Sequence, residues 1–202
     1  MTESPAHNTA LSCYDSVLQA IAHKQKTAAA PVLVAIDGRC GSGKTGLARL
    51  IRHVFSCPII HIDDFYLPFS DRPRGWDGIP GGAIDLDRIL TQVLLPARAG
   101  TSILIQPFDC HTGTWGAVTT IPPAPLLVLE GSYSLHPRLR CFYDLTLFLT
   151  CSQQAQARRL KAREASAYSV FQTRWIPMEE QYFQRFQLPD PDSLVVDTTA
   201  LF

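Results

Sequence analysis

The chain has 202 residues, of which 46% are hydrophobic and 18% are charged, and its 18 Lys and Arg residues balance 18 Asp and Glu residues. This composition predicts a folded globular domain, and the lack of a basic excess argues against a nucleic-acid partner. No apolar run approaches the roughly 18 residues of a membrane span, and the sequence does not start with basic residues followed by an apolar stretch, so we expect a cytoplasmic protein that contacts no membrane.

The first predicted elements alternate between helix and strand. Apolar residues recur at helical spacing over 11–26, and both 32–36 and 59–62 are short continuous apolar runs, which are typical of buried strands. A helical stretch over about 44–55 lies between the two runs. This strand–turn–helix–strand order is a βαβ unit, and it predicts an α/β fold with a mostly parallel central sheet flanked by helices.

A long loop over 63–83, rich in proline and glycine, follows this unit. Long loops in compact domains are often functional, so this segment is a candidate part of a binding site. We expect residues 1–30 to form an N-terminal helix and residues 31–202 to form one domain with a small lid over roughly 152–175. The other expected elements are helices at 85–95, 153–164 and 177–186 and strands at 102–105, 126–129, 145–149 and 194–196.

Residues 38–45 read Gly-Arg-Cys-Gly-Ser-Gly-Lys-Thr and satisfy the phosphate-loop pattern G-x-x-x-x-G-K-[ST]. Glycine lets backbone N–H groups approach phosphate oxygens closely, and the N-terminus of the following helix adds positive potential. In this pattern the lysine reaches the terminal phosphates and the threonine hydroxyl can bind Mg²⁺. The motif therefore predicts a nucleotide–Mg²⁺ site formed by Gly38, Gly41, Ser42, Gly43, Lys44, Thr45 and Gly46.

Acidic residues end two of the predicted strands. Asp63 and Asp64 follow the second strand, and Glu130 follows the apolar run at 126–129. Ligands of α/β sheets bind at the carboxyl ends of parallel strands, so Asp63 and Glu130 are candidate Mg²⁺ ligands beside Thr45. Acids at a strand end are also common in solvated turns, and that alternative stays open for each of them taken alone.

An arginine-rich helix follows the strand at 145–149. Its residues Arg159 and Arg163 are four apart and therefore share one face of the helix. An arginine on a lid can neutralise charge on a transferring phosphoryl group. A solvated helix face, in which arginine serves helix propensity, is an equally weighted alternative.

Asn8 is the only asparagine of the chain. GTPases read guanine with an N-K-x-D motif, and protein kinases need an H-R-D-x-x-x-x-N loop, so the sequence fits neither class. The long loop at 63–83 favours an acceptor pocket beside the phosphates. The expected activity is therefore that of a small-molecule kinase rather than of a mechanical ATPase.

Several segments of the chain together resemble the uridine kinase family of phosphate-loop kinases, and in particular its bacterial uridine-kinase-like members of about this size. These segments are Ile36–Thr45, His61–Tyr66, Leu129–Gly131, Pro107–Trp115 and Arg174–Pro177. The similarity covers about residues 31–197. It implies a P-loop NTPase fold, ATP as the phosphoryl donor, and a nucleoside such as uridine as the acceptor.

The resemblance also implies a role for each matching residue. Asp63 would be the general base that takes the proton of the acceptor hydroxyl, beside the catalytic Lys44. Glu130 would help to hold Mg²⁺, and Arg159 and Arg163 would clamp the phosphates from the lid. The residues that would bind the acceptor are Asp63, Tyr66, Asp85, Phe108, Asp109 and His111.

The sequence departs from the family pattern at two places. Pyrimidine-reading members carry a Tyr-Asp pair with a histidine several residues later, whereas here Phe108 replaces the tyrosine and His111 lies two residues after Asp109. The phosphate loop usually continues with a second Thr or Ser, whereas Gly46 follows Thr45 here. Because a lost hydrogen-bonding group can change the substrate outright, uridine is expected to be a modest substrate at best.

Two alternatives to a nucleoside kinase stay open. One is a kinase of another hydroxylated metabolite, such as a sugar, pantothenate or a vitamin alcohol. The other is a regulatory module that binds ATP without a small acceptor. In the first alternative, as in a nucleoside kinase, the expected partner is a small molecule rather than a nucleic acid or a membrane, and a homo-oligomer is compatible with the sequence.

Overall fold

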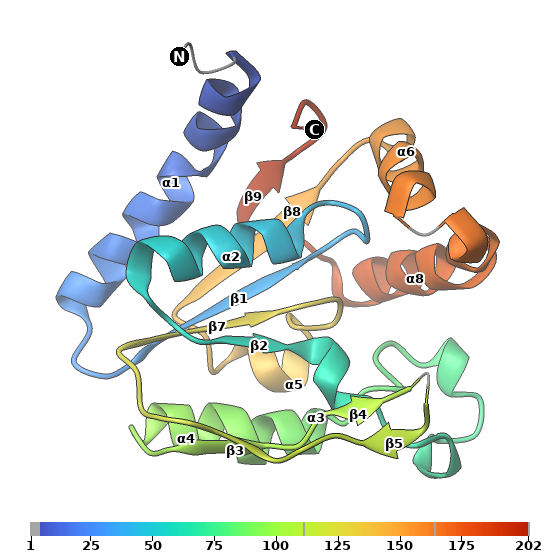
Figure 1. Cartoon of the computed structure of the whole chain (residues 1–202), viewed down its shortest axis with the longest axis horizontal. Helices are drawn as coiled ribbons and strands as arrows, with labels where there is room; N and C mark the ends of the chain where they lie inside the picture. The colour runs from blue at the N-terminus through green and yellow to red at the C-terminus, as the bar shows by residue number, and fades with distance from the viewer. Residues whose placement is uncertain (1–4, 111, 164, 202) are drawn as a thin grey trace.

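The computed structural model describes residues 5–110, 112–163 and 165–201, with side chains described from residue 14 onward. Its centre is a five-stranded sheet in the order β2-β7-β1-β8-β9, and all neighbouring strands are parallel (Figure 1). The predicted α/β class with a parallel central sheet is therefore confirmed. The strands are β1 (Val32–Gly38), β2 (Ile59–His61), β7 (Leu126–Glu130), β8 (Leu145–Thr150) and β9 (Leu194–Asp197).

Both faces of the sheet are buried, as the continuous apolar runs predict. Successive side chains of a strand point to opposite faces. In β1, Leu33 and Ala35 join one core cluster, while Val32, Val34 and Ile36 join the other. The sheet therefore needs a helical layer on each face.

The first face is covered by α1 (Pro5–Thr27) and α2 (Lys44–Phe55), which lie across the sheet in Figure 1. Val17 and Ile21 of α1 are fully buried against β1, β8 and β9. Leu47 of α2 is equally buried. The apolar residues that recur at helical spacing in both segments thus form the side of each helix that packs on the sheet.

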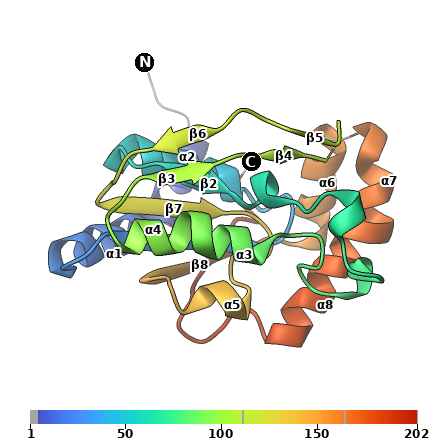
Figure 2. The same cartoon turned by 90° about the horizontal axis from the view of Figure 1, so that it is seen from below.

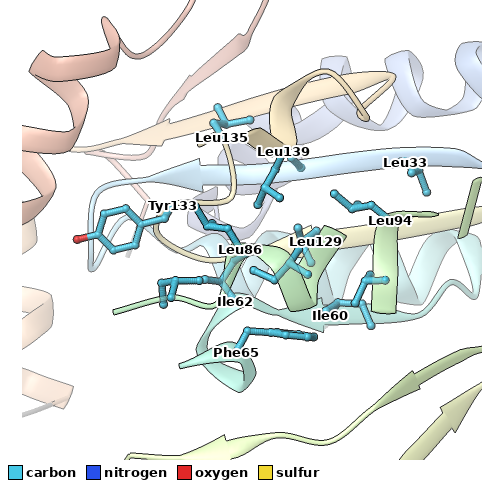
Figure 3. Packing of buried hydrophobic residues seen from close by; sticks show 14 of the residues in the cluster. Leu33, Ile60, Ile62, Phe65, Leu86, Leu94, Leu129, Tyr133, Leu135 and Leu139 are labelled. Atoms are coloured by element: carbon cyan, nitrogen blue, oxygen red, sulfur yellow. The ribbon is translucent and has the colours of Figure 1, made fainter. Parts of the chain in front are cut away.

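The second face is covered by a continuous helical segment over 86–98, by the short helix α5 and by α8. Leu94 of the segment over 86–98 lies in one core cluster with Leu129 of β7 and Ile60 of β2, and Leu139 of α5 packs into the same layer (Figure 3). The predicted helix at 85–95 is present, but it runs to Arg98 and contains a π-helical turn. The elements are α3 (Leu86–Arg88), η4 (Ile89–Leu94, the π turn), α4 (Leu95–Arg98), α5 (Pro137–Arg140) and α8 (Ile176–Phe186).

The segments outside these layers are short and more exposed. The predicted loop at 63–83 is folded into 3₁₀ turns, and the segment after β8 forms a helix followed by further short turns. The predicted strand at 102–105 forms outside the main sheet, as half of an antiparallel pair. These elements are η1 (Ile62–Phe65), η2 (Phe69–Asp71), η3 (Trp76–Gly78), β3 (Ile103–Ile105), β4 (Phe108–Asp109), β5 (Thr114–Trp115), β6 (Thr119–Ile121), α6 (Gln153–Arg163), η5 (Ala165–Ala167), α7 (Tyr168–Val170) and η6 (Phe171–Trp175, a π turn).

No helix in the described part of the chain is both long enough and apolar enough to cross a membrane.

Candidate functional site

One large cleft, with a volume of about 1100 Å³, opens at the carboxyl edge of the sheet. It is bounded by the β1–α2 loop, the turns after β2, the β4–β5 hairpin, the end of β7 and the segment from α6 to α8. Figures 1 and 2 both place the turns after β2 beside α7 and α8, so the cleft lies between segments far apart in the sequence. Of the predicted site residues, those that line it are Gly41, Gly43, Lys44, Thr45, Gly46, Asp63, Tyr66, Phe108, Asp109, Glu130 and Arg163.

The β1–α2 loop has a backbone that requires glycine. Gly38 has φ +127°, and a Cβ atom there would lie 1.9 Å from the carbonyl oxygen of Leu149 in β8. Gly43 has φ 95° at the N-cap of α2, and no side chain caps this helix. The first N–H groups of α2 are therefore available to an anion in the cleft, as a phosphate-binding loop requires.

Lys44 and Thr45 occupy the positions that the motif predicts. The ammonium group of Lys44 donates hydrogen bonds to the carbonyl oxygens of Gly38 at 2.6 Å and Arg39 at 3.1 Å. The Thr45 hydroxyl donates to Oε1 of Glu130 at 3.0 Å. A cation, a hydroxyl and a carboxylate thus meet at the start of α2.

The Glu130 carboxylate has a second partner, His61, which the sequence analysis did not single out. Its Nδ1 lies 2.6 Å from Oε1 of Glu130. Burial alone would raise the pKa of Glu130, but the hydrogen bonds from His61 and Thr45 and the charge of Lys44 together lower it. The hydrogen bond to Glu130 in turn raises the pKa of His61. Glu130 is therefore held as an anion.

Thr45 and Glu130 fit a Mg²⁺ ion. Adjacent ligands of an octahedral Mg²⁺, each at about 2.1 Å, lie about 3 Å apart, and the two oxygens are 3.0 Å apart. No cluster of three or more His, Cys, Asp or Glu side chains suited to a metal occurs among the described residues. Mg²⁺ does not need one, because it is usually held by one or two protein oxygens together with phosphate oxygens and waters.

Asp63 and Asp64 follow β2 in η1, and both line the cleft. Asp63 is accessible to solvent, yet the surrounding protein partly desolvates it, which raises its pKa against the opposing charge of Lys44. Desolvation also raises the pKa of Asp64, against the opposing charge of His61. The geometry brings both carboxylates to the cleft, so the choice of Asp63 as the base stays a prediction.

Four predicted residues play supporting roles in the described structure. Gly38 and Ser42 are buried beneath the loop and do not line the cleft. Asp85 also does not line it and instead caps α3, accepting from the backbone N–H of Arg88 at 3.0 Å. The guanidinium of Arg159 donates to the carbonyl oxygens of Gly41 and of the C-terminal residues Thr198 and Leu201.

The acceptor role of Asp85 and the phosphate contact of Arg159 stay predictions. His111, the remaining predicted acceptor residue, lies outside the described residues.

Helix α8 contacts the phosphate loop through two glutamates. Glu179 is buried and accepts hydrogen bonds from the backbone N–H of Cys40 at 2.9 Å and from the hydroxyl of Ser132 at 2.6 Å. Its neighbour Glu180 forms an ion pair with Arg39. The loop is thus held by α8 as well as by α2.

Asp37, the residue before the loop, is fully buried at the end of β1. Its carboxylate accepts hydrogen bonds from the N–H groups of Gly38 at 2.7 Å and Leu135 at 2.8 Å, and from the Tyr182 hydroxyl at 2.7 Å. Burial raises the pKa of Asp37 to about 6, although these hydrogen bonds and the charge of Lys44 oppose the shift. Asp37 therefore joins the start of the loop to α8.

The parallel sheet and the glycine loop that opens α2 define the P-loop NTPase fold. No protein-family model matches the chain, and no curated protein matches it either. The similarity to known proteins is therefore a similarity to solved structures.

Three solved structures are similar to this chain over most of its length. A protein from Bacillus stearothermophilus described as a "Possible Uridine Kinase" superposes with a TM-score of 0.73 at 18% identity, covering 94% of this chain and 100% of that one. A Silicibacter sp. TM1040 protein assigned as a fructose transport system kinase gives 0.68 at 18% identity, with 89% and 97% covered. A Saccharomyces cerevisiae protein assigned as a P-loop kinase with a circular permutation gives 0.63 at 13% identity, with 96% and 99% covered.

Proposed function

We propose that this chain is an ATP- and Mg²⁺-dependent kinase that transfers the γ-phosphoryl group to a hydroxyl of a small molecule. The observation that carries the proposal is the single cleft in which Lys44, Thr45 and Glu130 lie together with Asp63. Phosphoryl transfer depends mostly on positioning and on charge stabilisation, and these four side chains supply both. The P-loop kinase fold of the structural neighbours is consistent with this reaction.

Each of these residues has a defined task in the proposed reaction. The N–H groups at the start of α2 and the Lys44 ammonium bind the β- and γ-phosphates. Thr45 and Glu130 hold Mg²⁺, which supplies neutralisation of the phosphate charge when it is bound. Asp63 accepts the proton of the attacking hydroxyl, and Arg163 faces the same cleft from α6 as the proposed phosphate clamp.

The acceptor end of the cleft argues against efficient uridine recognition. Phe108 is buried, and its ring packs edge-on against Trp115 with the centroids 5.1 Å apart. It cannot donate a hydrogen bond to a base, and its position is fixed by the β4–β5 hairpin. We therefore favour another hydroxylated metabolite over uridine as the acceptor.

The experiment that tests the proposal measures ADP release with and without candidate acceptors. Lys44→Ala should lower kcat/KM by at least about a hundredfold, because one charged donor to a developing phosphoryl charge is worth that much. The fold should survive, since the hydrogen bonds that Lys44 makes in the described structure go to two carbonyl oxygens at the cleft, where water can replace it. Turnover close to wild type in Lys44→Ala would show that this loop is not the catalytic phosphate site.

A further inference from the structure

Two arginine side chains converge on one tryptophan at the acceptor end of the cleft. The guanidinium carbon of Arg72 lies 4.7 Å from the centroid of the Trp76 ring, and that of Arg174 also lies 4.7 Å from it. Arg72 belongs to the turns after β2 and Arg174 to η6 of the lid segment, and all three residues line the cleft. Figure 2 shows these two segments side by side.

Arg72 is held in place from several directions. Its guanidinium stacks 4.0 Å from the centroid of the Phe69 ring. Its Nε donates to the carbonyl oxygen of Leu67 at 3.1 Å, and one terminal nitrogen lies 3.3 Å from Sγ of Cys110. The other terminal nitrogen has no hydrogen-bond partner within the described structure. An arginine fixed in this way is preorganised to receive a ligand, because little rotamer entropy remains to be lost.

Neither guanidinium group is paired with a carboxylate of the described residues. No carboxylate in the described part of the chain lies within 4.0 Å of either one. Four other arginines do form ion pairs with carboxylates in the described structure, among them Arg98 with Asp144 and Arg140 with Asp190. Aromatic faces attract a cation but do not neutralise it, so two like charges beside one ring leave a positive potential in the cleft.

The end of the cleft that holds Arg72 and Arg174 adjoins the end that holds the carboxylates of Asp63 and Asp109. Burial raises the pKa of the Cys110 thiol, and the charges of Asp109 and Asp63 add to this effect while Arg72, 3.3 Å from Sγ, opposes it, so both kinds of charge act on Cys110. One end of the acceptor site therefore suits a hydroxyl that must lose a proton, and the other end suits an anion.

Resting on the kinase function proposed above, we propose that the acceptor carries an oxyanion group, a carboxylate or a phosphate, which binds to Arg72 and Arg174 while its hydroxyl faces Asp63. The planar guanidinium presents its N–H donors in the spacing of carboxylate and phosphate oxygens, which a neutral sugar or nucleoside does not offer. The anion also relieves the repulsion between the two arginines.

The test compares acceptors that differ only in this group. The pairs are D-ribose 5-phosphate with D-ribose, D-glycerate with glycerol, and pantothenate with pantothenyl alcohol, and uridine is a further neutral acceptor. At least one anionic member should exceed its neutral partner in kcat/KM by tenfold or more. The ribose pair reports on phosphate and the other two on carboxylate. The proposal would be overturned if, in all three pairs, the neutral acceptor were used as well as its anionic partner.

The variants Arg72→Gln and Arg174→Gln should each raise the KM for the anionic acceptor at least tenfold and leave the KM for ATP within twofold. Arg174 is exposed, so its replacement tests the proposal even if Arg72→Gln impairs folding. The matched control is Arg74→Gln, an exposed arginine of the same loop that does not line the cleft. An unchanged acceptor KM in Arg174→Gln would contradict the proposal.

A binding measurement separates this proposal from the kinase function. With the phosphate loop saturated by Mg²⁺ and a non-hydrolysable ATP analogue, inorganic phosphate or acetate should change the tryptophan fluorescence saturably in wild type and Arg74→Gln, but not in Arg72→Gln or Arg174→Gln. Such binding without turnover of any acceptor would leave the anion site in place and reject the kinase function. Turnover of neutral acceptors without this binding would reject the anion site alone.

Discussion

At the scale of single residues, the cleft places two carboxylates with different proposed tasks, one that stays ionised and one that accepts a proton. In the proposed reaction Glu130 holds Mg²⁺ as an anion, and His61, Thr45 and Lys44 lower its pKa. In the proposed reaction Asp63 accepts a proton, and the pKa that partial desolvation raises makes it a stronger base than a fully solvated aspartate. The same type of side chain thus serves two tasks, which its surroundings decide.

The two neighbouring acids after β2 should differ in function. Asp63→Asn should lower kcat by about a hundredfold or more, because a positioned general base contributes at least that much. Asp64→Asn should cost less than tenfold, since successive residues point in different directions and only one carboxylate reaches the hydroxyl. Turnover at saturating ATP measures both variants. A larger loss in Asp64→Asn would assign the base to Asp64 instead.

Asp37 should make the stability of the protein depend on pH. Its folded pKa of about 6 lies above the ordinary value of 3.8, so the folded state binds more protons than the unfolded state between these values. The stability that this group contributes is therefore fully present below about pH 4 and is lost as the pH rises through 6, by about 3 kcal/mol in all. The free energy of unfolding of wild type relative to Asp37→Asn should fall accordingly between pH 4.5 and 7. A difference that does not vary with pH would contradict this.

At the scale of elements, the sequence predicts those that a short pattern specifies. The core strands are continuous apolar runs, and the phosphate loop is a motif of eight consecutive residues, so both follow from local chemistry. The strands β4, β5 and β6 are short and largely exposed, so their residues carry no such pattern. The contacts of α8 with Arg39 and Cys40 join residues about 140 positions apart, and only the folded chain reveals them.

The glycine after Thr45 weakens the first turn of α2. A Cβ atom at Gly46 would meet nothing within 4 Å, and its φ is not positive. Gly46→Ala should therefore stabilise the protein by about 0.5–1 kcal/mol through helix propensity. Gly41→Ala is the opposite control, because φ is +75° there and its Cβ would lie 3.3 Å from Leu160. Denaturant unfolding measures both, and a destabilised Gly46→Ala would show that this position needs glycine for another reason.

At the scale of the whole molecule, the cleft is assembled from segments that belong to different layers. The phosphate loop is fixed by the sheet, by α2 and by α8, whereas the proposed acceptor end depends on exposed turns and on the segment from α6 to α8. The sequence could predict the first part from one motif. It could not predict the convergence of Arg72 and Arg174 on Trp76, because stacking across a cleft depends on how the turns after β2 and the lid segment meet.

This arrangement predicts that Mg²⁺ and nucleotide together stabilise the whole fold. A ligand at about a hundred times its Kd adds about 2.7 kcal/mol to the free energy of unfolding, which for a chain of this size raises Tm by about 5–10 °C. Because Thr45 and Glu130 are placed to hold the metal, a non-hydrolysable ATP analogue at the same concentration should give a clearly smaller shift in Tm in EDTA.

Glu130→Gln should lose most of this Mg²⁺-dependent difference in Tm, and Lys44→Ala should lose most of the nucleotide-induced shift in Tm itself. Arg52→Gln, an exposed substitution in the last turn of α2, should respond like wild type. An equal shift with and without Mg²⁺ in wild type would show that Thr45 and Glu130 do not form the metal site.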